Sequence, residues 1–502
     1  MPKPGEHKTF YARICKYAKS LFRLFFPAST YRNPDRSVDS DLPIANKMNA
    51  PSTIEGKWWI DGPSGDAHFG TLQYAPTAGL ELGVKVPQEK EIEDLLGTFS
   101  KPPPAVPDTI FGRNKDNHPI SLYGCSITNY NSSGGLKSYT ISPRIALIGR
   151  EVPEWDEVSF RQINAEYSLF HNWMGLSNIT VGRNHDLTVK LKERNTVEAD
   201  IDSTTKMVIW PTLQFNQDNS KVNLVEGHGV EFRFTEPCSV KKTRLTYVES
   251  FRRCLTLLIS RPVFVDKVYF HPNDGEVPHE ANLLQSNPGV ESADRKTLSP
   301  GMVVSYSDIS ENFGAVIKRW FELEESLADV LNLYFATIFV PGLYINQTFL
   351  FLAQALEVYH RTSPNFENHV QPKADFRARK KGIIEKVPEE KDWLTEKLAH
   401  ANEKTLAQRL NELMGLHQNE VDQFIEDTTE FSDSIRHTRN HFTHYGTGDK
   451  GMEKVAEGIQ LIDLTAKMQT ILELCIFSDL GISGAPISRM IQNLKERRYY
   501  EL

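Results

Sequence analysis

The residues best suited to chemistry lie in one short run near the C-terminus, residues 434–446. Within it, Arg439 is followed at once by Asn440, and His444 comes four positions after that asparagine. A guanidinium keeps its charge and can bind a phosphate through two nitrogens. An imidazole exchanges protons near neutral pH. The run therefore contains the groups needed to hold a phosphate and to move protons beside it.

These groups are expected to lie on a helix spanning residues 420–445. Side chains that recur every three or four positions predict a helix face turned toward a core. They are Phe431, Ile435, Thr438, Phe442 and Tyr445. Asn440 and His444 are four residues apart and stack on another face, with Arg439 at its flank. Gly446 is suited to end the helix, so His444 lies in the last turn, where the helix dipole favours its protonated form.

Such a set can cleave RNA without a metal. The ribose 2′-hydroxyl would attack the adjacent phosphorus, an imidazole would transfer protons, and a guanidinium would stabilise the negative charge. The run places a single imidazole with certainty. A second copy of the chain, related by a two-fold axis, would complete the site.

Two other interpretations of the run remain open. Its polar residues can form an ordinary solvated helix face. Alternatively, His437, His441 and His444 lie within about 60° of one another on a helical wheel and can bind Zn²⁺. No carboxylate or cysteine has an ideal spacing for completing that metal site, which favours a site without a metal.

Composition restricts the class of protein. The chain has 502 residues, 39% of them hydrophobic and 24% charged, which is typical of a soluble globular protein of two or three domains. The net charge of −8 means that nucleic acid must be bound by local basic patches. The five cysteines are scattered and no two form a C-x-x-C pair, so we expect a reducing, cytoplasmic environment. No apolar run is long enough to span a membrane, and no nucleotide-binding or zinc-protease motif predicts a cofactor.

The pattern of polar and apolar residues divides the chain into three parts. Residues 1–53 are expected to be a tail and linker. Residues 54–300 contain many short alternating segments separated by turns, which predicts a β-rich sandwich or barrel-like domain. Helical patches interrupt this domain at residues 162–174 and 241–260.

Residues 301–502 have a helical period and predict an all-α bundle of about five helices. Overall, the expected fold class is α+β, with the β-rich domain preceding the bundle. The expected helices span residues 308–339, 345–361, 391–414, 420–445 and 458–480, and a short piece covers 486–498.

The run Arg439-Asn440-His441-Phe442-Thr443-His444 resembles the signature of HEPN domains, in which Arg and a polar residue precede His by a fixed spacing. Three further segments are similar to ApeA-type anti-phage HEPN ribonucleases. They are Gly56-Lys57-Trp58-Trp59, the region around Val230-Glu231-Phe232-Arg233-Phe234, and the helix of residues 349–360. The resemblance covers most of residues 54–502.

This resemblance implies a bacterial abortive-infection nuclease that cuts host tRNA in the anticodon loop, without a cofactor. It implies a homodimer or larger homo-oligomer with composite sites, a phage-derived trigger, and no DNA partner. Arg439, Asn440 and His444 are then the catalytic candidates. Glu357 is a candidate partner for Arg439. The β-rich domain would restrain the nuclease or sense the trigger.

A dense basic run, residues 376–386, is a candidate tRNA contact. Its cations are Arg377, Arg379, Lys380, Lys381 and Lys386. A flexible basic loop of this kind could hold tRNA phosphates, but a solvated charge run offset by nearby glutamates has the same composition. The alternative for the whole chain is a non-catalytic protein, in which a HEPN-like bundle dimerises or binds RNA and the β-rich domain recognises a ligand.

Overall fold

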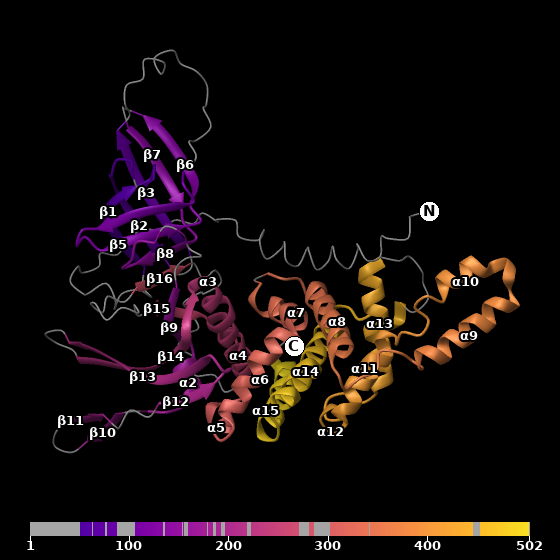
Figure 1. Ribbon diagram of the computed structural model, residues 1–502. Coiled ribbons are helices and arrows are strands. Elements are labelled where there is room, and N and C mark those ends of the chain that lie inside the picture. The colour runs from indigo at the N-terminus through magenta and orange to yellow at the C-terminus, as the bar shows by residue number, and fades with distance from the viewer. Residues whose placement is uncertain are drawn as a thin grey trace, which may run out of the picture.

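Figure 1 shows the computed structural model of the chain, with a strand-rich half followed by a helical half. The expected fold class is confirmed. The structure describes residues 51–62, 64–75, 78–87, 106–133, 136–152, 154, 159–177, 179–183, 187–191, 196–217, 222–270, 281–285, 302–340, 342–444 and 452–500. Nearly all of the expected N-terminal tail, and also Tyr445 and Gly446, lie outside these residues.

Fourteen of the strands form one continuous antiparallel sheet, in the order β12-β13-β14-β9-β15-β16-β8-β5-β4-β1-β2-β3-β7-β6. Their bounds are β1 Ser52–Trp59, β2 His68–Ala75, β3 Gly79–Pro87, β4 Thr109–Asn114, β5 Pro119–Tyr123, β6 Ser126–Ser133, β7 Leu136–Ser142, β8 Ile145–Ile148, β9 Ser159–Tyr167, β12 Val197–Asp200, β13 Thr205–Gln217, β14 Val222–Ser239, β15 Val265–Phe270 and β16 Ala281–Gln285. Strands β10 (Ile179–Arg183) and β11 (Leu187–Leu191) pair as a separate hairpin.

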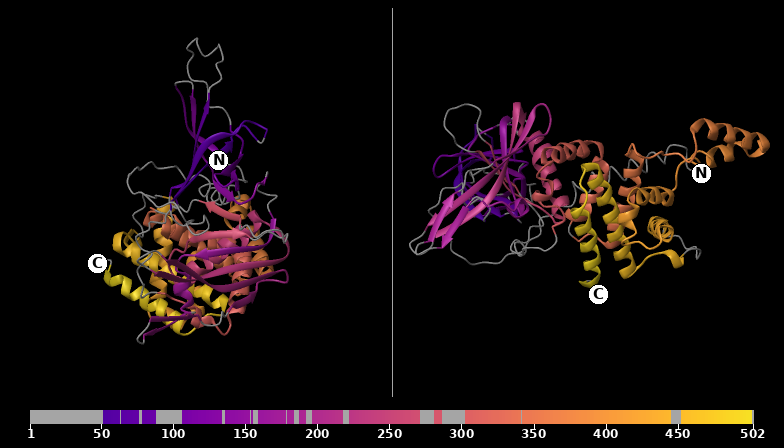
Figure 2. Two further views of the ribbon diagram at one scale, coloured as in Figure 1. Left: turned by 90° about the vertical axis from the view of Figure 1, so that its left-hand side faces the viewer. Right: turned by 90° about the horizontal axis from the view of Figure 1, so that it is seen from below.

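The strands of this single sheet contribute to two apolar cores. One core lies among β1 to β5, β7 and β8, at the upper left of Figure 1. The other begins on β9, β13 and β14 and continues without a break into the helical half. Both views of Figure 2 show the same division, with the helices against only one part of the sheet.

Trp58 is the centre of the first core and is fully buried. Its indole lies against glycines of the two neighbouring strands, Gly112 of β4 and Gly70 of β2. A Cβ atom at Gly112 would lie 2.2 Å from the indole, and one at Gly70 would lie 2.9 Å from it. Both distances are far below van der Waals contact, so glycine is required here for the tryptophan to fit. The neighbouring residue Trp59 is only half-buried, on the opposite face of β1.

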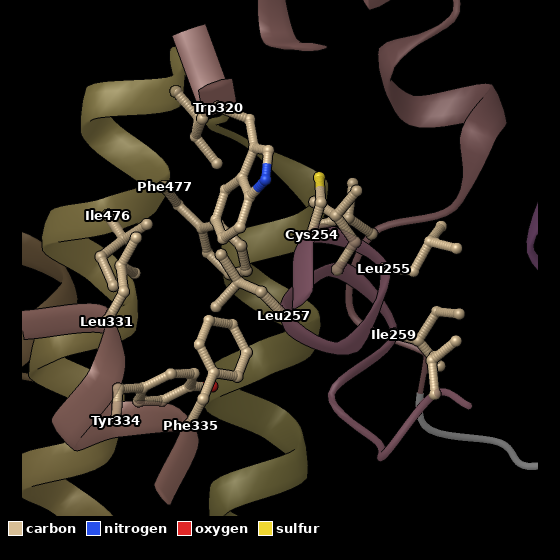
Figure 3. Close-up of a cluster of buried hydrophobic side chains, with 14 of the residues drawn as sticks. Cys254, Leu255, Leu257, Ile259, Trp320, Leu331, Tyr334, Phe335, Ile476 and Phe477 are labelled. Atoms are coloured by element: carbon tan, nitrogen blue, oxygen red, sulfur yellow. The ribbon is translucent and has the colours of Figure 1, made fainter. Parts of the chain in front are cut away.

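The helix expected at residues 241–260 is confirmed as a continuous helical segment. It comprises α3 (Val240–Thr243), a π-helical stretch (Arg244–Val248) and α4 (Glu249–Ile259). Figure 3 shows Leu257 of α4 between Trp320 and Phe335 of the helical half, whereas Leu255 points to the other side. Because both sides of α4 are buried, this helix joins the sheet and the bundle into one apolar core.

Buried polar contacts strengthen the same junction. The indole nitrogen of Trp320 donates to the carbonyl of Ser250 at 3.0 Å and lies 2.9 Å from its Oγ. Arg253 pairs with Glu324 at 3.2 Å, and its guanidinium stacks on the ring of Phe335 at 4.6 Å. A charge pair that is largely shielded from water depends strongly on its geometry, so these contacts fix how α4 lies against the helices.

The helical half contains more and shorter helices than the sequence predicted. Their bounds are α5 Tyr306–Ile309, α6 Phe313–Ser326, α7 Ala328–Phe339, α8 Ile345–Thr362, α9 Lys373–Lys386, α10 Lys391–Lys397, α11 Leu406–Leu416, α12 Gln418–Val421, α13 Thr428–His444, α14 Gly458–Leu480 and α15 Ala485–Tyr500. The helices expected at residues 308–339, 391–414 and 420–445 are each interrupted. The helix expected at 458–480 is confirmed with the same bounds, since Gly481 ends it in a left-handed conformation (φ 74°).

Two sequence predictions of local structure were wrong. The patch at residues 162–174 is not one helix: it begins in strand β9 and ends in the short helix α2 (Phe170–Met174). Its apolar side chains are buried by tertiary contacts with β14 and β15, which override the helical period. The basic run at 376–386 is not a loop but most of helix α9. Residues 373–386 have many strong helix formers, including Ala, Arg, Lys and Glu, and no proline.

A buried histidine gives the stability of the strand-rich half a pH dependence. Burial, together with the neighbouring His171, lowers the pKa of His228 to about 4; the two Nδ1 atoms are 3.0 Å apart. An unfolded histidine has a pKa near 6.5. Between these values the unfolded chain binds the proton and the folded chain does not. The free energy of unfolding is therefore expected to fall by about 3 kcal/mol as the pH drops from about 6.5 to 4.

Denaturant unfolding at pH 7 and pH 4.5 measures this change. The His228→Gln variant is expected to show a smaller pH dependence than the wild type. An equal pH dependence in His228→Gln and wild type contradicts the assignment.

Candidate active site

Helix α13 (Thr428–His444) carries the expected catalytic residues. Its first turn is capped by Asp427, whose Oδ1 accepts hydrogen bonds from two backbone N–H groups at 2.8 and 2.9 Å. The helix therefore begins at residue 428 rather than at 420, which lies in the separate short helix α12. Its last described residue is His444.

The expected core stripe of α13 is confirmed over its described part. Phe431, Ile435 and Thr438 are buried. The half-buried Phe442 meets Phe349 of α8 edge to face, with ring centroids 6.0 Å apart. The stripe thus fixes the rotation of α13 about its axis, and with it the face that Arg439 and Asn440 present.

A hydrogen bond fixes the segment after α13. The buried hydroxyl of Thr438 accepts from the backbone N–H of Ala456 at 2.9 Å. This bond holds the residues that precede α14 against the side of α13. The segment just before α14 therefore lies against α13 at Thr438.

Arg439 and Asn440 lie together on the polar face of α13. Arg439 is half-buried and Asn440 is exposed. The Arg439 guanidinium donates to Oδ1 of Asn440 at 3.3 Å. Among the residues that the structure describes, no carboxylate pairs with Arg439. Its charge is therefore available to an anion, with an amide beside it.

The other arginine of the run, Arg436, already has partners on α13 for its guanidinium. Arg436 contacts Asp433 at 3.1 Å and Nε2 of His437 at 2.9 Å. Lys454 also binds Asp433, at 3.1 Å, so the carboxylate is shared by two cations. These contacts make Arg436 part of the surface structure of α13 and distinguish it from Arg439.

The three histidines of the run differ in their surroundings. His437 accepts from Arg436 through Nε2, since a guanidinium can only donate. That nitrogen carries no proton in this arrangement and is not free to bind a metal. His441 is half-buried, and its ring packs on Phe442 with centroids 5.5 Å apart. His444 is placed as the last residue of α13, and its side chain lies outside the described part of the structure.

Glu357 does not contact Arg439 in this structure. Its carboxylate pairs with Arg361, one turn later on the same helix α8, at 2.8 Å. Arg361 in turn contacts Glu403 at 3.7 Å. The expected pairing was based on the resemblance of α8 alone, and an i,i+4 partner on the same helix satisfies this glutamate instead.

The basic residues of the run 376–386, which were considered as a flexible loop, lie on helix α9. This helix projects beside α10 at the edge of the helical half (Figure 1). No residue of α9 is buried. Arg377 and Arg379 are exposed and have no acidic partner among the described residues. Lys380 donates to the Thr395 carbonyl at 3.1 Å, and Lys381 lies 3.7 Å from Glu385. Of these four cations, Arg377 and Arg379 are thus fully available to a polyanion.

The base of the α9–α10 hairpin is held by a buried cluster that sequence reasoning missed. Arg409 is almost completely buried and contacts His360 at 2.9 Å and Asn368 at 2.8 Å. His360 also contacts Glu412 at 2.7 Å. Nothing in the spacing of these residues predicts the cluster, because Arg409 has the position of an ordinary cation in an amphipathic helix. The cluster anchors both ends of the exposed hairpin.

Comparison with known families agrees with this architecture. The model of ApeA N-terminal domain 1 matches residues 53–320, more than half of the chain. The Apea-like HEPN model matches residues 350–485, which include α9 and α13. No curated protein and no solved structure matches the chain. The chain belongs to the ApeA family, and its residues 350–485 match the Apea-like HEPN domain.

This membership supports an anti-phage effector of the HEPN ribonuclease class. The N-terminal match extends beyond the expected boundary at residue 300 and includes α5 and half of α6. In its described residues the protein has no helix with both the length and the apolar character needed to cross a bilayer.

Proposed function

We propose that the protein is an endoribonuclease that cuts tRNA in the anticodon loop without a metal ion, as an abortive-infection defence effector. The observation that carries this proposal is the state of Arg439. It is the arginine of the run that resembles the HEPN signature, it lies next to Asn440, and no described carboxylate neutralises it. The neighbouring arginine outside the signature, Arg436, is paired with Asp433.

The proposed reaction is an intramolecular transesterification. A base removes the proton of the ribose 2′-hydroxyl, the 2′-oxygen forms a bond to phosphorus, and the bond from phosphorus to the 5′-oxygen breaks. The 5′-oxygen leaves with a proton from an acid. His444 is the proposed proton-transfer group, Arg439 stabilises the charge on the phosphorane oxygens, and Asn440 orients them.

A second copy of the chain is proposed to supply the second imidazole. Exposed apolar side chains near the residues of α8 and of the segment before α14 that contact α13 support self-association. Tyr344 and Ile345 lie at the start of α8, one turn from the Phe349 that packs on Phe442. Ile459 and Ile462 lie in the first turns of α14, shortly after Ala456. Apolar residues grouped around a polar site are typical of a surface that another chain covers.

The strand-rich half is proposed to regulate the nuclease in response to a phage-derived trigger. The support is the shared core around α4, which ties the sheet to α6 through the contacts of Trp320 and Arg253. A rearrangement of the sheet that moves α4 would be transmitted to the bundle through these contacts.

The proposal is tested by incubating the purified protein with total tRNA in excess EDTA. Defined fragments are expected, and they should disappear in His444→Ala. Loss of all cleavage in EDTA would instead support metal-dependent chemistry by the histidines. An inactive wild type that still binds tRNA would support a non-catalytic RNA-binding protein.

The exposed cations of α9 are expected to bind tRNA. Replacing Arg377 and Arg379 together by Ala should weaken tRNA binding and reduce the slope of log K against log salt by about 1.5, since each lost phosphate contact removes about 0.7–0.9. Filter binding between 50 and 200 mM salt measures the slope. The control is the double replacement of Lys242 and Lys318, two exposed lysines elsewhere, by Ala. An unchanged slope in the α9 variant would exclude this role.

A further inference from the structure

The strand-rich half has a broad groove that the proposed nuclease chemistry does not use. It lies on the outward face of β4, β1, β2, β3 and β7 and has a volume of about 1130 Å³. This is the face opposite the Trp58 core, since buried and exposed side chains alternate along β1 and β3. It belongs to the upper lobe of Figure 1, whereas α13 lies in the helical half.

Phe69 is the most informative residue of this groove. It is 73% exposed on the middle of a regular sheet. It pairs across the strands with Lys57, whose Nζ lies 5.6 Å from the centre of the phenyl ring. A cation against an aromatic face is a weak interaction at an exposed site, so it does not explain why an apolar ring lies in water. The exposed ring is better explained as a platform for a ligand with a flat face.

The groove has a positive charge excess in a protein that is negative overall. Its walls hold Lys57, Lys85, Lys115 and Arg113 against two carboxylates, whereas the chain carries a net charge of −8. Lys115 is paired with Glu55 at 2.6 Å, and Arg113 with Glu151 at 3.1 Å. Lys57 and Lys85 have no acidic partner among the described residues. They flank Phe69 on the adjacent strands β1 and β3.

The floor beside Phe69 is flat and open. Thr71 pairs with Gly83 on the next strand. A Cβ atom at Gly83 would come no closer than 4.0 Å to any other heavy atom. The glycine is therefore not needed for packing, and it leaves the surface next to the exposed ring free of side chains.

We infer that this groove binds single-stranded RNA, with an unpaired base stacked on Phe69 and the neighbouring phosphates held by Lys57 and Lys85. Sheet surfaces bind single-stranded nucleic acid by stacking its bases on exposed aromatic rings and by placing cations along its sugar-phosphate backbone. A duplex has no free base face to offer. An acidic peptide would use the lysines but not the aromatic platform. The groove would thus give the strand-rich half an RNA contact that is separate from the nuclease site.

Fluorescence anisotropy with a labelled 2′-O-methyl oligouridine of twelve nucleotides tests the inference on the full chain. The probe has no free 2′-hydroxyl, so the result does not depend on whether the nuclease proposal holds. Phe69→Ala is expected to weaken binding about tenfold through the loss of one stacked base. The joint replacement of Lys57 and Lys85 by Ala should reduce the magnitude of the salt slope by about 1.4.

Three further variants guard against indirect effects. Gly83→Glu adds a carboxylate to the open floor without a clash and should also weaken binding. Leu245→Ala and Lys242→Ala remove an exposed apolar residue and an exposed cation elsewhere and should leave the affinity within twofold. Equal affinity in wild type and Phe69→Ala overturns the inference. The inference is also overturned if duplex RNA displaces the probe as well as single-stranded RNA does. That result would mean that the surface recognises only negative charge.

Discussion

Arg439→Ala is expected to reduce tRNA cleavage by a factor of about 100 to 1000. Removing one group that stabilises the developing negative charge of a transition state typically has an effect of this size. The rate should be measured with tRNA in excess of the protein, and folding should be checked by thermal unfolding. Stability is expected to stay close to that of the wild type, because the described contacts of the guanidinium are limited to Asn440 at 3.3 Å.

Arg436→Ala is the matched control for this prediction. It removes the same charge, three residues away on the same helix, but its guanidinium is bound to Asp433 and His437. We expect less than a fivefold loss of activity, since partly exposed ion pairs contribute little. If both variants lose activity equally, the effect comes from the net charge of α13 rather than from a specific arginine. Full activity in Arg439→Ala would remove Arg439 from the reaction.

Trp320→Ala is expected to give the largest loss of stability, about 3–5 kcal/mol. The indole is completely buried, and its N–H donates to Ser250 of α4. Replacing it by Ala leaves a cavity and removes this hydrogen bond at the junction of the two halves (Figure 3). The free energy of unfolding, measured in urea, should fall by that amount. Two separate transitions are expected if the sheet and the bundle then unfold independently.

The control is Trp393→Ala on α10, where the indole is 55% exposed. This variant should change the free energy of unfolding by less than about 0.5 kcal/mol. A change below about 1 kcal/mol in Trp320→Ala would show that the packing around α4 does not hold the halves together. The proposed route of regulation would then lose its support.

The sequence predicted the local features of the helical half well where the relevant interactions lie within one helix. The bounds of α14 follow from its apolar period and from Gly481, and the buried stripe of α13 follows from its spacing. Short-range signals of this kind are read directly from the chain. They were sufficient to place Arg439, Asn440 and His444 on one helix in the expected order.

The sequence could not predict contacts between distant segments. The pairing of β1 with β4 and of β3 with β7 skips intervening strands, and no local pattern specifies it. The burial of Arg409, and its contacts with His360 and Asn368, depend on which helices meet. The exposure of Phe69 could not be predicted either. The alternation of residues along a strand separates the two faces of the sheet, but it does not show which face is covered.

The most direct test of the central claim is the chemistry of the fragment ends. Attack by the 2′-hydroxyl leaves a 2′,3′-cyclic phosphate, or the phosphate formed from it, on one fragment and a 5′-hydroxyl on the other. Mapping of tRNA fragments made in EDTA by the wild type should show these ends within the anticodon loop, and Arg439→Ala should give far fewer of them. Fragments with 3′-hydroxyl and 5′-phosphate ends, or unchanged fragments from the Arg439 variant, would contradict a nuclease site built on this arginine.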